Sequence, residues 1–264
     1  IVWDNHACMP LRHNDPTFLP QLARVKQSGI NVVSLNVGFD LEPPEATFLM
    51  LASFRQWVLN HADDYLLVNT ADDIEKAVAS NRLAIVFDIE GGKAVEAHTG
   101  LVEVFYQLGV RWMLIAYNHN NKLGGGCQDK DCGLTAYGRQ VIDEMERVGM
   151  VLCCSHTGYQ TAREAIEYSS KPVIFSHSNP LALMDHPRNI PDDLMLACAQ
   201  TGGVVNINGV GVFLGNKDNS TENLLRHIDY AVDLIGPQHV GLGLDYVFDE
   251  AECIEYFKAN PDIF

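Results

Sequence analysis

Eight short apolar runs alternate along the chain with longer stretches in which apolar residues recur at helical spacing. The runs are rich in Val, Ile and Leu, as is typical of strands buried on both faces of a parallel sheet. They occupy residues 1–3, 31–37, 83–87, 112–117, 151–154, 172–175, 203–207 and 239–244. Strands that alternate with helices favour a parallel sheet. Eight of them predict an α/β fold of the (β/α)8 TIM-type barrel class, a parallel eight-stranded sheet with outer helices.

The stretches between the runs predict the outer helices. They occupy residues 16–28, 43–62, 71–80, 101–108, 135–148, 159–168, 191–201 and 221–235. The helix at 43–62, for example, begins after two prolines and places Phe48, Leu51 and Phe54 on one side. Because barrels of this class commonly occupy about 250 residues, the 264 residues predict a single domain over 1–264.

In such barrels the reactive groups lie at the C-terminal ends of the strands. Here these ends carry histidines, carboxylates and further polar side chains. The residues are His6 with Cys8, Glu90, Tyr117 with Asn118, His156, His177 and Asp245. Neutral imidazole and carboxylate both bind zinc or a related divalent ion at about 2.0–2.2 Å. The pattern therefore predicts a metal site on one rim of the barrel.

The stretch from Val151 to Pro180 contains one motif twice, an apolar run followed by Ser-His. The segment between the two copies has helical spacing, so the stretch predicts strand, helix and strand. A crossover of this kind puts both strand ends on the same face of the sheet, where His156 and His177 can converge. The alternative for each histidine alone is a hydrogen-bonded core or loop residue. The two together favour the metal site.

Two carboxylates at strand ends have distinct expected roles. Metal ions about 3.5–4 Å apart need a group that reaches both, and a carboxylate has two oxygens to share. Glu90, followed by two glycines that permit a tight turn, is expected to bridge two ions. Its alternative role is to cap a helix N-terminus. Asp245 is expected to accept and donate protons. Its alternative role is to cap a turn.

The predicted reaction class is metal-assisted hydrolysis. A bound metal lowers the pKa of its water towards about 7, which supplies a metal-bound hydroxide at neutral pH. A nearby carboxylate can take a proton and pass it to a leaving amine. The sequence lacks the G-x-S-x-G elbow of many serine hydrolases. It also lacks a P-loop, because the glycines at 124–126 are not followed by Lys-Ser/Thr.

Charge and cysteine content limit the partners and the compartment. The formal net charge of −16 argues against nucleic acid or an anionic membrane surface as a partner. No apolar run reaches the roughly 18 residues that span a bilayer, and the first residues do not resemble a signal peptide. Seven cysteines, an odd number, favour a reducing, cytoplasmic setting. Cys127 and Cys132 could pair or bind metal, but without a second pair they are a weak zinc signal.

Several motifs, in this order and spacing, carry a resemblance to a known family. They are Asp4-Asn5-His6, Glu90-Gly91-Gly92, Ser155-His156, Ser176-His177-Ser178-Asn179, HPRNIPD at 186–192 and VGLGLD at 240–245. From Trp3 to about Asp249 the chain resembles the membrane (renal-type) dipeptidase family, whose members are metal-dependent barrels that hydrolyse dipeptides. The resemblance implies zinc, two ions per chain, and a homodimer, since dimers are common in the family.

The resemblance also implies roles for single residues. His6 is a ligand of one metal ion, His156 and His177 hold the other, and Glu90 is the bridge. Asp245 is implied to carry the proton.

Arg188 is implied to bind the terminal carboxylate of the substrate, which a guanidinium meets in a two-point fork. Without the resemblance, the same residue would be interpreted as a loop arginine paired with Asp192 or Asp193.

The chain departs from the family pattern in three places. Cys8 stands where the first motif usually has an aspartate. A thiolate can bind zinc, so Cys8 is an expected ligand, although it could leave one metal position weak or be a small buried hydrophobe. The family often has a histidine at the end of the fourth run, but this chain has Tyr117-Asn118-His119. Tyr117 or His119 could stabilise an oxyanion, with Asn118 as a candidate substrate contact. The chain also stops at Phe264, so closing C-terminal helices are expected beyond it.

Three hypotheses follow. The leading one is a zinc-dependent dipeptidase that acts on a small peptide with a free carboxylate through a binuclear site. The second keeps the barrel and the metals but takes an N-acyl amino acid, a lactam or another amide. The third is a barrel that binds a metal or small ligand without turnover, which the Cys8 replacement makes plausible.

Overall fold

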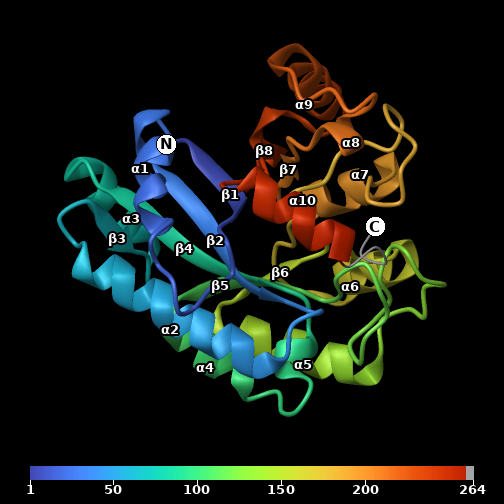
Figure 1. Cartoon of the computed structure of the whole chain (residues 1–264). Helices are drawn as coiled ribbons and strands as arrows, with labels where there is room; N and C mark the ends of the chain where they lie inside the picture. Colours follow the sequence, from blue (N-terminus) through green and yellow to red (C-terminus); the bar gives the residue numbers. More distant parts are fainter. Residues whose placement is uncertain (260–264) are drawn as a thin grey trace.

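The computed structural model describes residues 1–259 and contains one parallel sheet that curls into a barrel (Figure 1). Its main path has the strand order β6-β5-β4-β2-β1-β8-β7, with β3 beside β4 and β9 beside β1. The strands are β1 Trp3–Cys8, β2 Val32–Phe39, β3 Tyr65–Leu67, β4 Leu83–Glu90, β5 Val110–Leu114, β6 Val151–Cys153, β7 Val205–Ile207, β8 Val240–Leu242 and β9 Tyr246–Val247. All the strand pairs are parallel.

The gap between β6 and β7 is closed by residues 172–175, which were predicted as a strand. Ile174 forms an isolated parallel bridge to Cys153 of β6, and Phe175 forms one to Val205 of β7. This segment therefore occupies the eighth position of the ring without being long enough to count as a strand. The predicted (β/α)8 barrel class is confirmed.

Most helices cover the outer face of the sheet; in Figure 1, α2, α4 and α5 lie below the strands. Their bounds are α1 Leu22–Gln27, α2 Pro44–Asn60, α3 Ala71–Ala79, α4 Leu101–Leu108, α5 Ala136–Val148, α6 Tyr159–Tyr168, α7 Asp192–Gln200, α8 Gly211–Leu214, α9 Thr221–Ile235 and α10 Glu250–Ala259. In the described part of the chain, no helix is both long and apolar enough to cross a membrane.

Alternate residues of β4 face two different environments, because successive side chains of a strand point to opposite sides. Ile85, Phe87 and Ile89 belong to the main core, which also contains Phe54 of α2 and Phe105 of α4. Ala84 and Val86 belong to a second apolar cluster. By alternation, Asp88 and Glu90 continue this second face towards the C-terminal end of the strand. Their carboxyl groups are thereby directed into the barrel.

The structure differs from the prediction at several element boundaries. The first strand was predicted at 1–3, whereas β1 runs from Trp3 to Cys8. Asp4, Asn5 and His6 follow the apolar run and were interpreted as polar groups at its C-terminal end, but they are buried residues within the strand. Polar residues inside a barrel break the apolar pattern on which strand prediction depends.

Short elements account for most of the other differences. The elements β3, β9, α8 and α10 were not predicted. Of these, β3, β9 and α8 are two to four residues long. The predicted helix at 16–28 consists of a 3-10 turn at Leu19–Gln21 followed by α1.

All seven cysteines are free thiols. Cys127 Sγ donates to Asn118 Oδ1 at 3.5 Å, and Cys132 is exposed. Neither belongs to a metal-binding group found among the described residues. The weak zinc signal of this cysteine pair therefore has no structural counterpart there, and the reducing, cytoplasmic setting stays a prediction.

Candidate metal centre

A histidine and a cysteine near the C-terminal end of β1 lie at the mouth of the barrel. Ala7 and Met9 pack in the main core, so His6 and Cys8 point the other way. The pairing of β1 with β2 shifts register between Asp4 and Ala7. A register shift of this kind changes the direction in which side chains point at the end of a strand.

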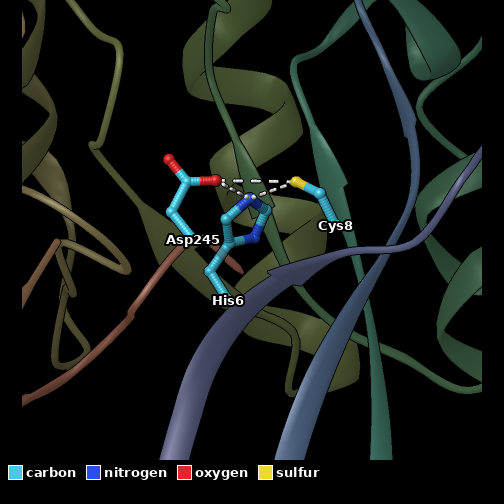
Figure 2. A group of neighbouring side chains, drawn as sticks. All are labelled: His6, Cys8 and Asp245. Atoms are coloured by element: carbon cyan, nitrogen blue, oxygen red, sulfur yellow. Dashed lines mark hydrogen bonds and ion pairs between the residues drawn. The ribbon is translucent and has the colours of Figure 1, made fainter. Parts of the chain in front are cut away.

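His6, Cys8 and Asp245 form one candidate metal-binding group (Figure 2). Cys8 Sγ lies 3.4 Å from His6 Nε2 and 3.6 Å from Asp245 Oδ1, and His6 Nε2 lies 3.7 Å from Asp245 Oδ1. Ligands that are about 2.0–2.3 Å from a tetrahedral zinc ion lie about 3.3–3.7 Å from one another. The three atoms therefore have the spacing of three ligands around one ion. We call this group, together with Glu90, the cysteine position.

His156 and His177 form a second group around Glu90. Glu90 Oε1 lies 3.2 Å from Nε2 of His156 and 3.2 Å from Nε2 of His177. The same oxygen lies 3.4 Å from His6 Nε2. The rings of His6 and His177 stack with 4.0 Å between centroids, so the two groups are neighbours. We call His156 and His177 with Glu90 the two-histidine position.

The donor atoms of the two-histidine position fit a cation. His156 Nδ1 is bonded to Asn118 Oδ1 at 2.7 Å, and His177 Nδ1 to Ser176 Oγ at 2.7 Å. With the protons on these Nδ1 atoms, both Nε2 atoms present lone pairs to Glu90. Glu90 Oε1 is buried and has no hydrogen-bond partner. Buried lone pairs that face one another are costly unless a proton or a metal cation lies between them. The residues present therefore fit divalent metal ions.

Burial sets the charge states of these groups when they are considered without metal. It raises the pKa of Glu90 to about 8 and lowers the pKa values of His156 and His177 well below the usual range. Burial also lowers the pKa of His6, but Glu90, Cys8 and Asp88 together raise it well above its ordinary value. Neutral imidazoles are the form that binds metal.

Three residues at the site have left-handed backbone conformations, with φ of 58° at Asn118, 60° at His156 and 59° at Asp245. This region is sparsely populated by residues other than glycine, although Asn, Asp and His enter it more readily than most. The strain concentrates where the strands turn into loops at the barrel mouth. Functional sites commonly store backbone strain of this kind.

Asp245 is held by both of its carboxyl oxygens. Oδ1 faces His6 and Cys8, and Oδ2 accepts a hydrogen bond from Asn208 Nδ2 at 2.9 Å. Its backbone N–H donates to the carbonyl oxygen of His6 at 2.9 Å. Asn208 was not predicted as part of the site. It lies just beyond β7. The rule that reactive groups lie at the C-terminal ends of the strands, which selected the other site residues, would also have selected Asn208.

Arg188 is 2% exposed and is not paired with Asp192 or Asp193 as the loop alternative supposed. Its Nη2 donates to the carbonyl oxygen of His177 at 3.0 Å, and its Nε has no hydrogen-bond partner. Asp192 instead accepts from Tyr230, and Asp193 from Tyr159.

The guanidinium of Arg188 lies 5.4 Å from the ring of Phe213. No carboxylate forms an ion pair with this guanidinium among residues 1–259. The cation therefore lies beside the two-histidine position with hydrogen-bonding capacity unused.

Tyr117, Asn118 and His119, at the end of the fourth predicted strand, lie in different places. Tyr117 stacks on His156 with 4.1 Å between ring centroids and lines the cavity at the barrel mouth. Asn118 is fully buried and contacts His156. His119 is bonded to Asp129 at 3.0 Å and is not among the residues that line this cavity. Their roles in binding or catalysis stay predictions.

A cavity of about 600 Å³ opens above the metal-binding groups. Cys8, Glu90, Tyr117, His156 and Asp245 line its floor, and most of its walls are apolar. The walls include Met9, Leu11, Phe39, Val210, Val212, Phe213, Val247 and Tyr256. Residues of α10 close one side, where the helix crosses in front of β1 and β8 in Figure 1.

The sequence profile of the membrane dipeptidase family (peptidase family M19) matches residues 20–256. The chain belongs to this family. The resemblance carried by the sequence motifs is thereby confirmed.

Relatives of the membrane dipeptidase family support the same assignment. An uncharacterized dipeptidase of Schizosaccharomyces pombe is 34% identical over 203 residues, which cover 73% of this chain and 48% of that protein. The dipeptidase verJ of Clonostachys rogersoniana is 29% identical over 208 residues, covering 78% of this chain and 54% of that protein. The chain spans about half the length of these relatives.

Solved structures match the fold closely. An amidohydrolase from Pseudomonas aeruginosa has a TM-score of 0.87 and 30% identity, covering 94% of this chain and 74% of that one. A metallo peptidase from Rhodobacter sphaeroides, liganded with a phosphinate mimic of the dipeptide L-Ala-D-Ala, has a TM-score of 0.83 and 21% identity. That match covers 93% of this chain and 85% of the other, and it supports the barrel fold alone.

Proposed function

We propose that this chain is a zinc-dependent dipeptidase with two metal positions. The observation that carries the proposal is the approach of two imidazole nitrogens, His156 Nε2 and His177 Nε2, to Glu90 Oε1 at 3.2 Å each. The buried guanidinium of Arg188, which forms no ion pair among residues 1–259, lies beside them. Membership of the membrane dipeptidase family supports the choice of a dipeptide as substrate.

The proposed ligands divide between the two positions. His6 and Cys8 would hold one zinc ion and His156 and His177 the other, while Glu90, whose Oε1 lies 3.2–3.4 Å from Nε2 of all three histidines, would serve both. The chemistry that bound zinc supplies is a lowered pKa of water and polarisation of the substrate carbonyl. The remaining steps depend on side chains of the chain itself.

Asp245 is proposed to carry the proton. Its Oδ1 faces His6 and Cys8, and the Asn208 amide holds Oδ2, so the carboxyl group cannot rotate freely. It also lines the cavity floor, within reach of a substrate. From this place Asp245 accepts a proton from the attacking water and returns it to the leaving amine.

Tyr117 is proposed to stabilise the oxyanion. Burial, together with Glu90, raises the pKa of the Tyr117 hydroxyl well above its usual value, so the hydroxyl keeps its proton. A protonated hydroxyl at the cavity floor can donate a hydrogen bond to the developing negative charge. His119, the other candidate, is already bonded to Asp129 outside the cavity lining, which favours Tyr117.

Arg188 is proposed to bind the terminal carboxylate of the dipeptide. The two oxygens of a carboxylate match the paired N–H donors of a guanidinium. Phe213 lies against this guanidinium and also lines the cavity, so its ring must move aside for a carboxylate to enter. Phe213 is on α8, a helix of four residues that ends at Leu214 and is followed by Gly215, where φ is 108°.

The test combines metal analysis with a panel of dipeptides that includes L-Ala-D-Ala. We expect about two zinc ions per chain and hydrolysis of free dipeptides, with much slower turnover of the matching dipeptide amides. The amides serve as the control, because they keep the scissile bond and lack the carboxylate. Less than one equivalent of metal, with no hydrolysis after zinc is added, would contradict the proposal.

A second candidate is an amidohydrolase that acts on N-acyl amino acids or lactams. The 30% identity to a solved protein described as an amidohydrolase favours keeping it. Faster turnover of N-acetyl amino acids than of any dipeptide would support this alternative. Two bound zinc ions without turnover of either class would instead support a barrel that only binds metal.

A further inference from the structure

We propose that the two metal positions are unequal, with the cysteine position filling first and preferring zinc, cobalt or cadmium to manganese. The inference rests on the proposed function, because it assumes that both positions bind metal. It goes further by assigning an order of loading and a metal preference to this chain. The two positions differ both in their donor atoms and in the side chains behind those atoms.

The donor atoms of the two positions differ in softness. Cys8 Sγ lies within 3.4–3.6 Å of both His6 Nε2 and Asp245 Oδ1, so sulfur belongs to the first donor set. The two-histidine position has only imidazole nitrogen and the shared carboxylate oxygen. Thiolate ligands select zinc and related ions, whereas manganese prefers oxygen donors.

The side chains behind the ligands differ in charge. His6 Nδ1 has no hydrogen-bond partner, but it lies 3.5 Å from Asp88 Oδ1, so a carboxyl group lies behind this imidazole. His156 and His177 are backed by uncharged partners, the amide of Asn118 and the hydroxyl of Ser176. A carboxylate behind a metal-binding histidine makes the imidazole a stronger donor.

The charged side chains near the two positions also favour binding of the first metal ion at the cysteine position. Besides Glu90, which both positions share, the cysteine position has the carboxyl groups of Asp245 and Asp88 beside His6. The two-histidine position has a permanent cation beside it, because Arg188 Nη2 donates to the carbonyl oxygen of His177. A dication is therefore attracted more strongly to the cysteine position.

Asp88 is held in place from β2. It is fully buried, and Asn36, its register partner on β2, donates from Nδ2 to Oδ1 at 3.3 Å. Its Oδ2 has no hydrogen-bond partner. Asp88 does not line the cavity, so we infer that it is a positioning residue that acts through His6.

The test is a titration of the metal-stripped chain with cobalt(II), followed by absorption spectroscopy. A cysteine thiolate bound to cobalt gives a sulfur-to-metal charge-transfer band in the near ultraviolet. We expect this band to reach full intensity with the first equivalent, while the second equivalent adds only the weak visible bands of nitrogen and oxygen ligands. An excess of manganese should displace the second equivalent of cobalt, while the charge-transfer band keeps its intensity.

Two cysteine variants test which cysteine sulfur produces the charge-transfer band. Cys8→Asp keeps an ionisable ligand, so it should bind both equivalents without the band. Cys253→Ser is the matched control, because Cys253 lines the same cavity, and it should keep the band. Two bound cobalt ions without the band, a band that survives Cys8→Asp, or a band that grows only with the second equivalent would overturn the inference. A chain that binds no cobalt at all would contradict the proposed function as well.

Asp88→Asn tests the carboxylate behind His6. It should lower the affinity for the first cobalt equivalent about 10- to 100-fold and leave the affinity for the second unchanged. The charge-transfer band should persist once the first position is saturated. Equal losses at both positions would mean that Asp88 only supports the fold, which would exclude it as a positioning residue.

Discussion

His156 Nε2 lies 2.9 Å from His177 Nε2, although the Nδ1 atom of each ring is already bonded to another side chain. Ser176 Oγ donates to Ser155 Oγ at 3.4 Å, which leaves it to accept from His177 Nδ1. The two Nε2 lone pairs therefore face each other and Glu90 in a buried space. A shared metal ion removes this repulsion, so the geometry is better suited to the metal-loaded state.

His177→Ala should empty one metal position. We expect zinc content to fall by about one ion per chain and dipeptide hydrolysis to fall by at least about 10³-fold, because one ligand and part of the electrostatic stabilisation are lost. Metal analysis and kcat/KM for one dipeptide measure both effects. Full activity in this variant would exclude His177 as a ligand.

Asn118→Ala should weaken zinc binding at the two-histidine position about 10- to 100-fold, because Asn118 Oδ1 holds the tautomer of His156. Asn118→Asp is the matched control. It keeps an oxygen acceptor and tolerates the left-handed backbone, for which φ is 58°. A competition titration against a chromogenic chelator gives both affinities. Similar losses in the two variants would assign Asn118 a role other than setting the tautomer.

Arg188→Met should raise KM for free dipeptides and lower kcat/KM about 10²-fold, since methionine fills the space but cannot bind a carboxylate. The kcat/KM for dipeptide amides should change by less than about threefold. The ratio of the two rates is the informative quantity, because it cancels any general loss of folded protein. A parallel loss for acids and amides would show that Arg188 supports the fold rather than the substrate.

The barrel class and the convergence of His156 with His177 could be predicted from the sequence. The C-terminal ends of parallel strands lie on the same side of the sheet, and the repeated Ser-His motif follows two strands at these ends. Asp88 was not predicted as part of the site, although it lies two residues before Glu90. It directly follows the apolar run predicted at 83–87, whereas in the structure it is a buried residue of β4 that lies beside His6.

The contacts of Arg188 could not be predicted either. Its hydrogen bond to the backbone of His177 and its cover by Phe213 depend on how loops fold over the barrel mouth. Loop conformation leaves little trace in apolar periodicity, from which strands and helices are predicted. The same reason explains why the sequence offered Asp192 and Asp193 as partners for Arg188.

Asp40 should make stability depend on pH in the acid range. Burial raises the pKa of its carboxyl group to about 6, despite hydrogen bonds from the N–H groups of Lys93 and Tyr117 and from the Asn121 amide. The folded chain therefore holds this proton more tightly than the unfolded chain does. The stability contribution of the proton is complete below about pH 4 and is lost as pH rises through about 6.

Comparison with Asp40→Asn isolates this contribution. The asparagine side chain cannot accept all three hydrogen bonds, so the variant should be less stable at every pH. The difference in unfolding free energy between the wild type and Asp40→Asn should be larger at pH 4 than at pH 7. Urea unfolding at both values measures it. A difference that does not change with pH would mean that Asp40 has an ordinary pKa.

Gly243→Ala should destabilise the chain by about 2–4 kcal/mol, because the site leaves no room for a methyl group. A Cβ at Gly243 would lie 1.8 Å from the carbonyl oxygen of Ser176 and 3.2 Å from His177 Cβ. Relieving this clash requires β8 to move away from the segment that carries His177, and Asp245 would move with it. We therefore expect lower zinc affinity in addition to a lower urea midpoint. Gly100→Ala is the control, since its Cβ would meet only the exposed His98 ring, and its midpoint should change little. Equal midpoints for the two variants would show that β8 and the His177 segment are not packed as tightly as described.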